Sequence, residues 1–188
     1  MIDPSNITNY NQNDYQLEET LLFWILAAGK NGTRAAKCLE ELISYVWVPN
    51  HSPFDLLRPF KREGISHMLK ECKSGCRNLK ARTIIELIEK NLDLMSCTPD
   101  ELESVFGIGR KTSRCFIIHS RKNARYAGLD THILKFLNAE GVPNVPKSTP
   151  STKKDYLRLE QEFLSLADKN KMAPADLDLQ VWNKYAVK

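Results

Sequence analysis

The chain has 188 residues, of which 42% are hydrophobic and 27% charged, with eight glycines and nine prolines. These proportions are those of a globular protein, and they exclude collagen-like, low-complexity and disordered chains. With 27 Lys and Arg against 23 Asp and Glu, the net charge of +4 is compatible with a polyanionic partner without requiring one.

The hydropathy pattern predicts a soluble chain. The longest uninterrupted apolar run, Leu21 to Ala28, has eight residues, whereas a membrane-spanning helix needs about 20. The N-terminus lacks the basic and apolar regions of a secretory signal. We therefore expect a cytoplasmic protein without a membrane partner.

The five cysteines are an odd number in a chain with no export signal, so we expect reduced thiols and no disulfide framework. Cys72 and Cys76 have the spacing of a metal knuckle, with His67 nearby, but no second pair follows at zinc-finger spacing. On a helix the two cysteines are simply neighbours on one face. We expect no metal site.

Apolar residues recur at helical spacing through the first half of the chain. Gly29 follows an apolar segment at the usual C-terminal glycine position, and Ser52 with Pro53 forms an N-cap followed by a first-turn proline. The helices predicted here span residues 17–28, 34–46, 52–57 and 79–94.

The second half continues the same pattern. Thr98, Pro99 and Glu101 form a capping box with a first-turn proline. The predicted helices begin at Thr98 and at Arg110 and span 131–140, 156–167 and 173–185. No segment alternates between apolar and polar residues as a strand would, so the sequence predicts an all-α protein.

Two glycines, Gly107 and Gly109, flank Ile108 between two predicted helices. Their missing Cβ atoms let the backbone approach a ligand, and the helix that begins at Arg110 would point free amides and its positive dipole end outward. This arrangement can hold a phosphate independently of base sequence. Such turns can also serve only to pack two helices.

The pattern Leu-x-x-Val-x-Gly-Ile-Gly-Arg-Lys-Thr, from Leu102 to Thr112, resembles the helix-hairpin-helix of the DNA glycosylase superfamily that includes endonuclease III and the 8-oxoguanine DNA glycosylases. Nineteen residues after Lys111, the segment Leu129-Asp130-Thr131-His132 resembles the one that carries the essential aspartate of that superfamily. Residues 77–82 are similar to its Asn-x-Lys-Ala segment. The resemblance covers about residues 17–185, and residues 98–137 are its most specific part.

The resemblance implies a two-lobed helical fold with the active-site cleft between the lobes. One lobe would comprise residues 34–126 and carry the helix-hairpin-helix at about residues 99–120. Residues 1–33 together with 127–188 would form the second lobe, which carries the catalytic aspartate.

Lys111 follows the hairpin directly. The resemblance implies that a lysine at this position releases the base and then cleaves the strand. An amine is nucleophilic only when neutral, and burial at the positive end of a helix is expected to lower its pKa. Asp130 heads a predicted helix, where its carboxylate can cap the helix and stay ionised, stabilise positive charge on the sugar, or take a proton from Lys111. The expected sequence is attack of Lys111 on C1′, departure of the base, a Schiff base, and β-elimination.

Further candidates follow from the same resemblance. DNA contacts are expected from Gly107, Ile108, Gly109, Arg110, Thr112, Lys30, Asn31 and His132. Lys30 or Asn31 stands where relatives carry the side chain that fills the space of an extruded base. His132 either contacts a phosphate or caps a neighbour. The aromatic residues Trp24, Trp182 and Tyr185 could stack on a purine, although aromatics at helical spacing are more often core.

No cysteine follows Cys115, so the iron–sulfur cluster that closes most endonuclease III relatives is not expected. We expect no cofactor; the hairpin leaves room for a monovalent cation. The resemblance then favours a cluster-free 8-oxoguanine DNA glycosylase/AP lyase acting as a monomer on damaged double-stranded DNA in the nucleoid. An endonuclease III-type oxidised-pyrimidine glycosylase/AP lyase, a non-catalytic DNA-binding module and a phage-type thymine-modifying enzyme are the alternatives.

Overall fold

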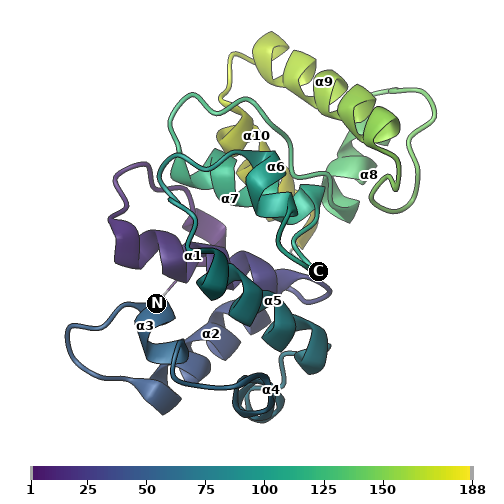
Figure 1. Cartoon of the computed structure of the whole chain (residues 1–188). Helices are drawn as coiled ribbons and strands as arrows, with labels where there is room; N and C mark the ends of the chain where they lie inside the picture. The colour runs from purple at the N-terminus through teal and green to yellow at the C-terminus, as the bar shows by residue number, and fades with distance from the viewer. Residues whose placement is uncertain (1, 187–188) are drawn as a thin grey trace.

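The computed structural model describes residues 2–186, and this part of the chain is built from helices (Figure 1). After a short 3-10 helix, Pro4–Asn6, the α-helices are α1 (Asp14–Ala27), α2 (Gly32–Val46), α3 (Pro53–Leu57), α4 (Arg62–Glu71), α5 (Arg77–Lys90), α6 (Pro99–Glu103), α7 (Arg110–Ser120), α8 (Thr131–Ala139), α9 (Lys153–Lys169) and α10 (Pro174–Ala186). The described residues contain no strand, which confirms the predicted all-α class.

The largest differences from the helices predicted by the sequence are at α4 and α5. Helix α4 was missed, because its apolar stripe is short and lies between basic residues. Helix α5 begins and ends earlier than the predicted 79–94, because Asn91 adopts a left-handed conformation (φ 47°) and terminates it.

Local capping fixes the start of α6 as the sequence predicts. The Thr98 hydroxyl accepts a hydrogen bond from the Glu101 amide at 3.2 Å, and the Glu101 carboxylate accepts one from the Thr98 amide at 2.7 Å. Since α6 leads directly into the hairpin, this reciprocal cap also sets the direction in which the hairpin begins.

The buried apolar residues form two clusters. The first runs from Ile7 to Ile117 and the second from Ala127 to Val181. Helix α1 is buried on most faces and packs on α2 and α7, and Figure 1 shows it between helices α2–α5 and helices α7–α10. Its apolar residues belong to the first cluster, whereas the predicted division grouped residues 1–33 with the C-terminal lobe. The division into lobes stays a prediction.

A buried ion network joins the two clusters. The Arg114 guanidinium on α7 donates to Glu160 of α9 at 2.9 Å and also pairs with Glu103 of α6. The same Glu160 carboxylate accepts a hydrogen bond from the Ala127 amide at 2.9 Å, at the point where the second cluster begins. One arginine therefore fixes the hairpin helices against α9.

Among the described residues, no helix combines the length and the apolar character that crossing a membrane requires.

Candidate active site

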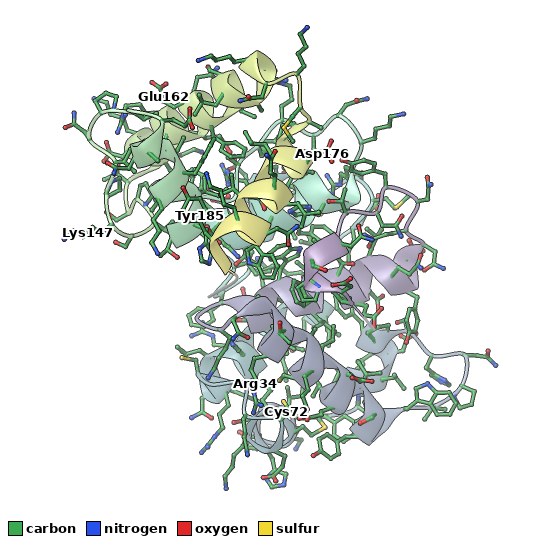
Figure 2. The ribbon with its side chains drawn as sticks, turned by 180° about the vertical axis from the view of Figure 1, so that it is seen from behind. Arg34, Cys72, Lys147, Glu162, Asp176 and Tyr185 are labelled. Carbon is green, nitrogen blue, oxygen red and sulfur yellow. The ribbon has the colours of Figure 1, made fainter. Side chains whose placement is uncertain are left out.

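A cavity of about 760 Å³ lies where α1, α7, α8 and α10 meet, and we call it the central cavity. Its walls come from the end of α1 and the loop to α2, from one face of α7, from the start of α8, and from α10. Figure 2 shows Tyr185, one of its lining residues, towards the end of α10 at the junction between the two halves of the molecule. Side chains far apart in sequence thus converge on one space.

Lys111 lies in the first turn of α7 and faces the central cavity. Its ammonium sits 4.6 Å from the centroid of the Trp24 ring, a cation–π contact that replaces part of its lost hydration. Cys115, one turn further along α7, also lines the cavity beside it. The structure therefore places the predicted nucleophile where a bound substrate can reach it.

The pKa of Lys111 differs from the predicted direction. Burial does lower it, as the sequence argument supposed, but the neighbouring Cys115 sulfur raises it, and so do the carboxylates of Asp130 and Asp178. The net result is a pKa above the usual lysine value. The prediction of a lowered pKa was wrong because it included burial and the helix dipole but not the partner charges. The Lys111 ammonium must therefore lose a proton before it can act as a nucleophile.

Asp130 caps α8 as predicted: one carboxylate oxygen accepts hydrogen bonds from the amides of His132 at 2.8 Å and Ile133 at 2.9 Å. Burial raises the pKa of this carboxyl and the neighbouring Asp178 raises it further, while the Lys111 charge lowers it. The net pKa lies above the usual aspartate value, so the group is a better proton acceptor than a solvated aspartate.

Close packing brings the two candidate catalytic residues to the same space. Gly128, two residues before Asp130, lies against α7: a Cβ there would meet the Cys115 sulfur at 2.1 Å. The missing side chain lets the segment that carries Asp130 approach the helix that carries Lys111.

Two functional candidates were missed by the sequence analysis. Asp178 of α10 lines the central cavity, and its carboxylate lies 3.2 Å from His119 Nε2. The other ring nitrogen of the buried His119 is 2.8 Å from the Thr8 hydroxyl, and the ring stacks on Trp24 at 5.5 Å. His119 therefore orients Asp178. No local pattern marks this pair, because the two residues are 59 positions apart and each follows a helical spacing.

Most of the predicted DNA and base contacts gather at the central cavity. Its lining includes Lys30, Asn31, Thr112, His132, Trp24, Trp182 and Tyr185. The Asn31 side chain caps α2 by accepting from the Arg34 amide at 2.8 Å. His132 Nδ1 is buried without a hydrogen-bond partner among the described residues, so this nitrogen is available to a ligand.

The hairpin residues Gly107, Ile108, Gly109 and Arg110 do not line the central cavity. Gly107 has φ +83°, and a Cβ there would meet the Thr83 hydroxyl at 2.2 Å, so the turn packs closely on α5. Gly109 has open space around its missing Cβ and directly precedes α7. Arg110 donates to the Ser151 carbonyl at 3.2 Å. The hairpin thus forms a separate backbone surface beside the cavity.

Residues 5–172 match the model of a protein family described as 8-oxoguanine DNA glycosylase. The chain belongs to the 8-oxoguanine DNA glycosylase family. The 8-oxoguanine DNA glycosylase/AP lyase of Saccharolobus solfataricus is 24% identical over 200 residues, covering 97% of this chain and 88% of that protein.

Solved structures of this family share the fold. The 8-oxoguanine DNA glycosylase of Thermotoga maritima superposes with a TM-score of 0.72 at 22% identity, over 98% of this chain and 86% of that one. The Methanocaldococcus jannaschii 8-oxoguanine glycosylase/lyase, in complex with 15mer DNA containing 8-oxoguanine, gives a TM-score of 0.72 at 18% identity, over 95% of this chain and 84% of that one. The fold class implied by the resemblance is confirmed.

Across the described residues of this family member, no group of three or more His, Cys, Asp or Glu side chains is arranged to hold a metal ion. The cysteines are free thiols, and only Cys76 is exposed. Whether the hairpin takes a monovalent cation stays a prediction.

Proposed function

We propose that this chain is an 8-oxoguanine DNA glycosylase with AP lyase activity, which removes the oxidised purine from double-stranded DNA and then cleaves the strand. The observation that carries the proposal is Lys111, held in the central cavity beside the carboxylates of Asp130 and Asp178. Family membership and the names of the relatives support the same activity. The enzyme would act as a monomer, and its cation-rich composition suits association with DNA.

The central cavity suits a purine extruded from the duplex. Its volume accommodates a flipped nucleotide, and Trp182 offers an aromatic face on which a base can stack. The Watson–Crick edge of a guanine-type base presents ring N–H and exocyclic amino donors, and Asp178 supplies a carboxylate acceptor for them. An oxidised thymine presents one N–H between two carbonyls, which the carboxylate would repel. Asp178 therefore favours the purine over the pyrimidine alternative.

Chemistry would begin with proton transfer from the Lys111 ammonium to Asp130. The neutral amine then attacks C1′; the glycosidic bond breaks and the base departs with its electron pair and is protonated. The departing base takes this proton from Asp130, and the carboxylate, ionised again, stabilises the positive charge on the sugar.

The covalent intermediate would lead to strand cleavage. Ring opening gives a Schiff base between Lys111 and C1′, loss of a C2′ proton breaks the C3′–O bond, and the 5′-phosphate end of the downstream strand leaves. Hydrolysis of the Schiff base regenerates the amine. A binding module that only holds phosphates would need neither the buried lysine nor the carboxylates around it.

The hairpin would hold the backbone while this happens. Gly109, at the positive end of α7, has open space around it and does not line the central cavity. A phosphate bound there would be recognised by backbone donors and helix dipole alone, and so without regard to sequence.

Product analysis on labelled duplexes tests the proposal. We expect base release from 8-oxoguanine opposite cytosine, strand cleavage without added alkali, and little release from thymine glycol. Release that needs alkali for cleavage would remove the lyase half of the proposal. A preference for thymine glycol would contradict the substrate.

A further inference from the structure

A second hollow lies outside the central cavity, between α4 and the start of α5, and we call it the α4–α5 groove. Its volume is about 450 Å³. Three permanent cations line it, Arg62, Lys70 and Arg77, together with His67 and a single carboxylate, Glu63. Positive charge therefore prevails in the groove.

The floor of the groove is an ordered polar surface. The buried Ser66 hydroxyl donates to the side-chain carbonyl of Asn78 at 2.6 Å, which leaves the N–H donors of that amide for other partners. Arg62 donates to the Asn78 backbone carbonyl at 3.4 Å, so this hydrogen bond joins α4 to α5 across the groove. Among the described residues, none of the three cations forms an ion pair within 4.0 Å. Their charge is available to a ligand.

The groove is held in a fixed position relative to the central cavity. The connection from α4 to α5 abuts the α1–α2 loop, since a Cβ on Gly75 would lie 2.8 Å from Lys30 Cε. Behind this contact the buried Lys80 ammonium donates to the Leu26 carbonyl at 2.8 Å and to the Ser74 carbonyl at 3.0 Å. Figure 1 shows both connections on the same side of the molecule. The start of α5, which carries Arg77, therefore follows a connection that lies beside Lys30, a residue that lines the central cavity.

The cations are spread along a line, which favours a chain of phosphates over a single anion. Arg62 and Lys70 stand at opposite ends of α4, and eight residues of helix span about 12 Å. One DNA strand rises about 3.4 Å per phosphate along the duplex axis and also winds around it, so its successive phosphates are further apart than this rise and 12 Å spans roughly two or three of them.

We propose that the α4–α5 groove binds backbone phosphates of the duplex that flanks the extruded base. The proposal rests on the proposed function, because it takes DNA as the substrate. Arg62, Lys70 and Arg77 supply charge to the phosphates without reading bases, and Asn78 adds an amide donor. The groove would thus hold the duplex at a second point, beyond the hairpin, while the base is in the central cavity.

The salt dependence of duplex binding tests the groove directly. The test variant is Arg62→Gln/Lys70→Gln/Arg77→Gln, and the matched control is Lys122→Gln/Lys169→Gln/Lys171→Gln, which removes three exposed charges outside the groove and the central cavity. Fluorescence anisotropy would follow an undamaged duplex across a salt series. Each phosphate contact contributes about 0.9 to the slope of log affinity against log salt, so the groove variant should lose about 2 to 3 from that slope and the control less than about 1.

Equal slopes in the two triple variants would overturn the groove. Should the groove variant fail to fold, Lys70→Gln alone, whose side chain has no hydrogen bond or ion pair among the described residues, should lower the slope by about 0.9. If inorganic phosphate binds in the groove but the salt slope of duplex binding is unchanged in the groove variant, the groove is a small-anion site. That result would also overturn the proposal.

The proposed function is tested separately in the same samples. Excision of 8-oxoguanine should occur in wild type and be unchanged in the control variant, whose three lysines lie outside both the groove and the central cavity. Excision with equal slopes would refute the groove alone, while loss of slope in an enzyme that excises nothing would refute the proposed function alone.

Discussion

At the scale of single residues, the chemistry depends on how three charges share one enclosed space. Burial opposes the Lys111 ammonium, and the neighbouring Cys115 sulfur together with the Asp130 and Asp178 carboxylates favours it. The same enclosure raises the pKa of Asp130, so this carboxylate is a better proton acceptor than a solvated aspartate. The sequence predicts Lys111 and Asp130 because both belong to local motifs. Asp178 is not predicted by the sequence, because only tertiary packing brings α10 close to Lys111 and Asp130.

Removing the Asp178 charge should weaken recognition of the base and at the same time make the Lys111 ammonium easier to deprotonate. In Asp178→Asn the pKa of Lys111 falls, because one negative neighbour is lost, so more of the amine is neutral at a given pH. Strand cleavage at a preformed abasic site should then shift to lower pH. Excision of 8-oxoguanine should fall by roughly 10- to 100-fold, the worth of one hydrogen bond to a charged group.

Single-turnover pH profiles on abasic and 8-oxoguanine duplexes measure both effects. Asp176→Asn, an exposed aspartate on the same helix, is the control and should change neither. An abasic-site profile that stays in place in Asp178→Asn would contradict the assigned charge balance.

At the scale of elements, the hairpin joins two helices, α6 and α7, whose first residues can be predicted from the local sequence. The capping box of α6 and the glycines before α7 are recognisable in the chain, and the structure has them where expected. Helix α4 is not, since its stability comes from burying Ile65, Met68 and Leu69 in the packing with α5 and α2 and not from a long amphipathic pattern. The groove along α4 was therefore beyond prediction.

The two hairpin glycines should respond differently to alanine. Gly107→Ala places a side chain at φ +83° against Thr83 and should cost about 1 to 3 kcal/mol of unfolding free energy. Gly109→Ala should leave stability nearly unchanged, because its Cβ meets nothing within 4 Å, yet it should weaken DNA binding by covering the backbone amides. Urea unfolding and duplex anisotropy measure the two quantities. Full DNA affinity in Gly109→Ala would refute the backbone contact.

At the scale of the whole molecule, the site exists only because two apolar clusters meet. Lys111 is on a helix of the first cluster, Asp130 and Asp178 come with the second, and Arg114 ties them together through Glu103 and Glu160. Local motifs predicted the family, the fold class and the two central residues. Three features could not be predicted: the placement of α1, the His119–Asp178 pair and the ion network. Each depends on contacts between residues far apart in the chain, which no local spacing indicates.

Arg114→Met should destabilise the protein by about 3 to 5 kcal/mol at neutral pH, because two carboxylates lose the cation that compensates their burial. Burial already raises the pKa of Glu160 above its unfolded value, so its ionised form opposes folding above that value and protonation relieves the cost as pH falls. The deficit relative to wild type should therefore shrink towards pH 5.

Urea unfolding at the two pH values checks this prediction. Arg125→Met is the matched control, since its pair with Asp168 is more than half exposed and solvent screening leaves such a pair little effect on stability. Equal losses in the two variants would show that the Arg114 network does not join the clusters.

Borohydride trapping tests the central claim most directly. Wild type, Lys111→Gln and the control Lys154→Gln would be mixed with duplexes containing 8-oxoguanine opposite cytosine or a preformed abasic site, and reduced during turnover. The account predicts a covalent adduct with both duplexes for wild type and control, and none for Lys111→Gln. An adduct that persists in Lys111→Gln, or its absence from wild type on the abasic duplex, would contradict Lys111 as the Schiff-base nucleophile.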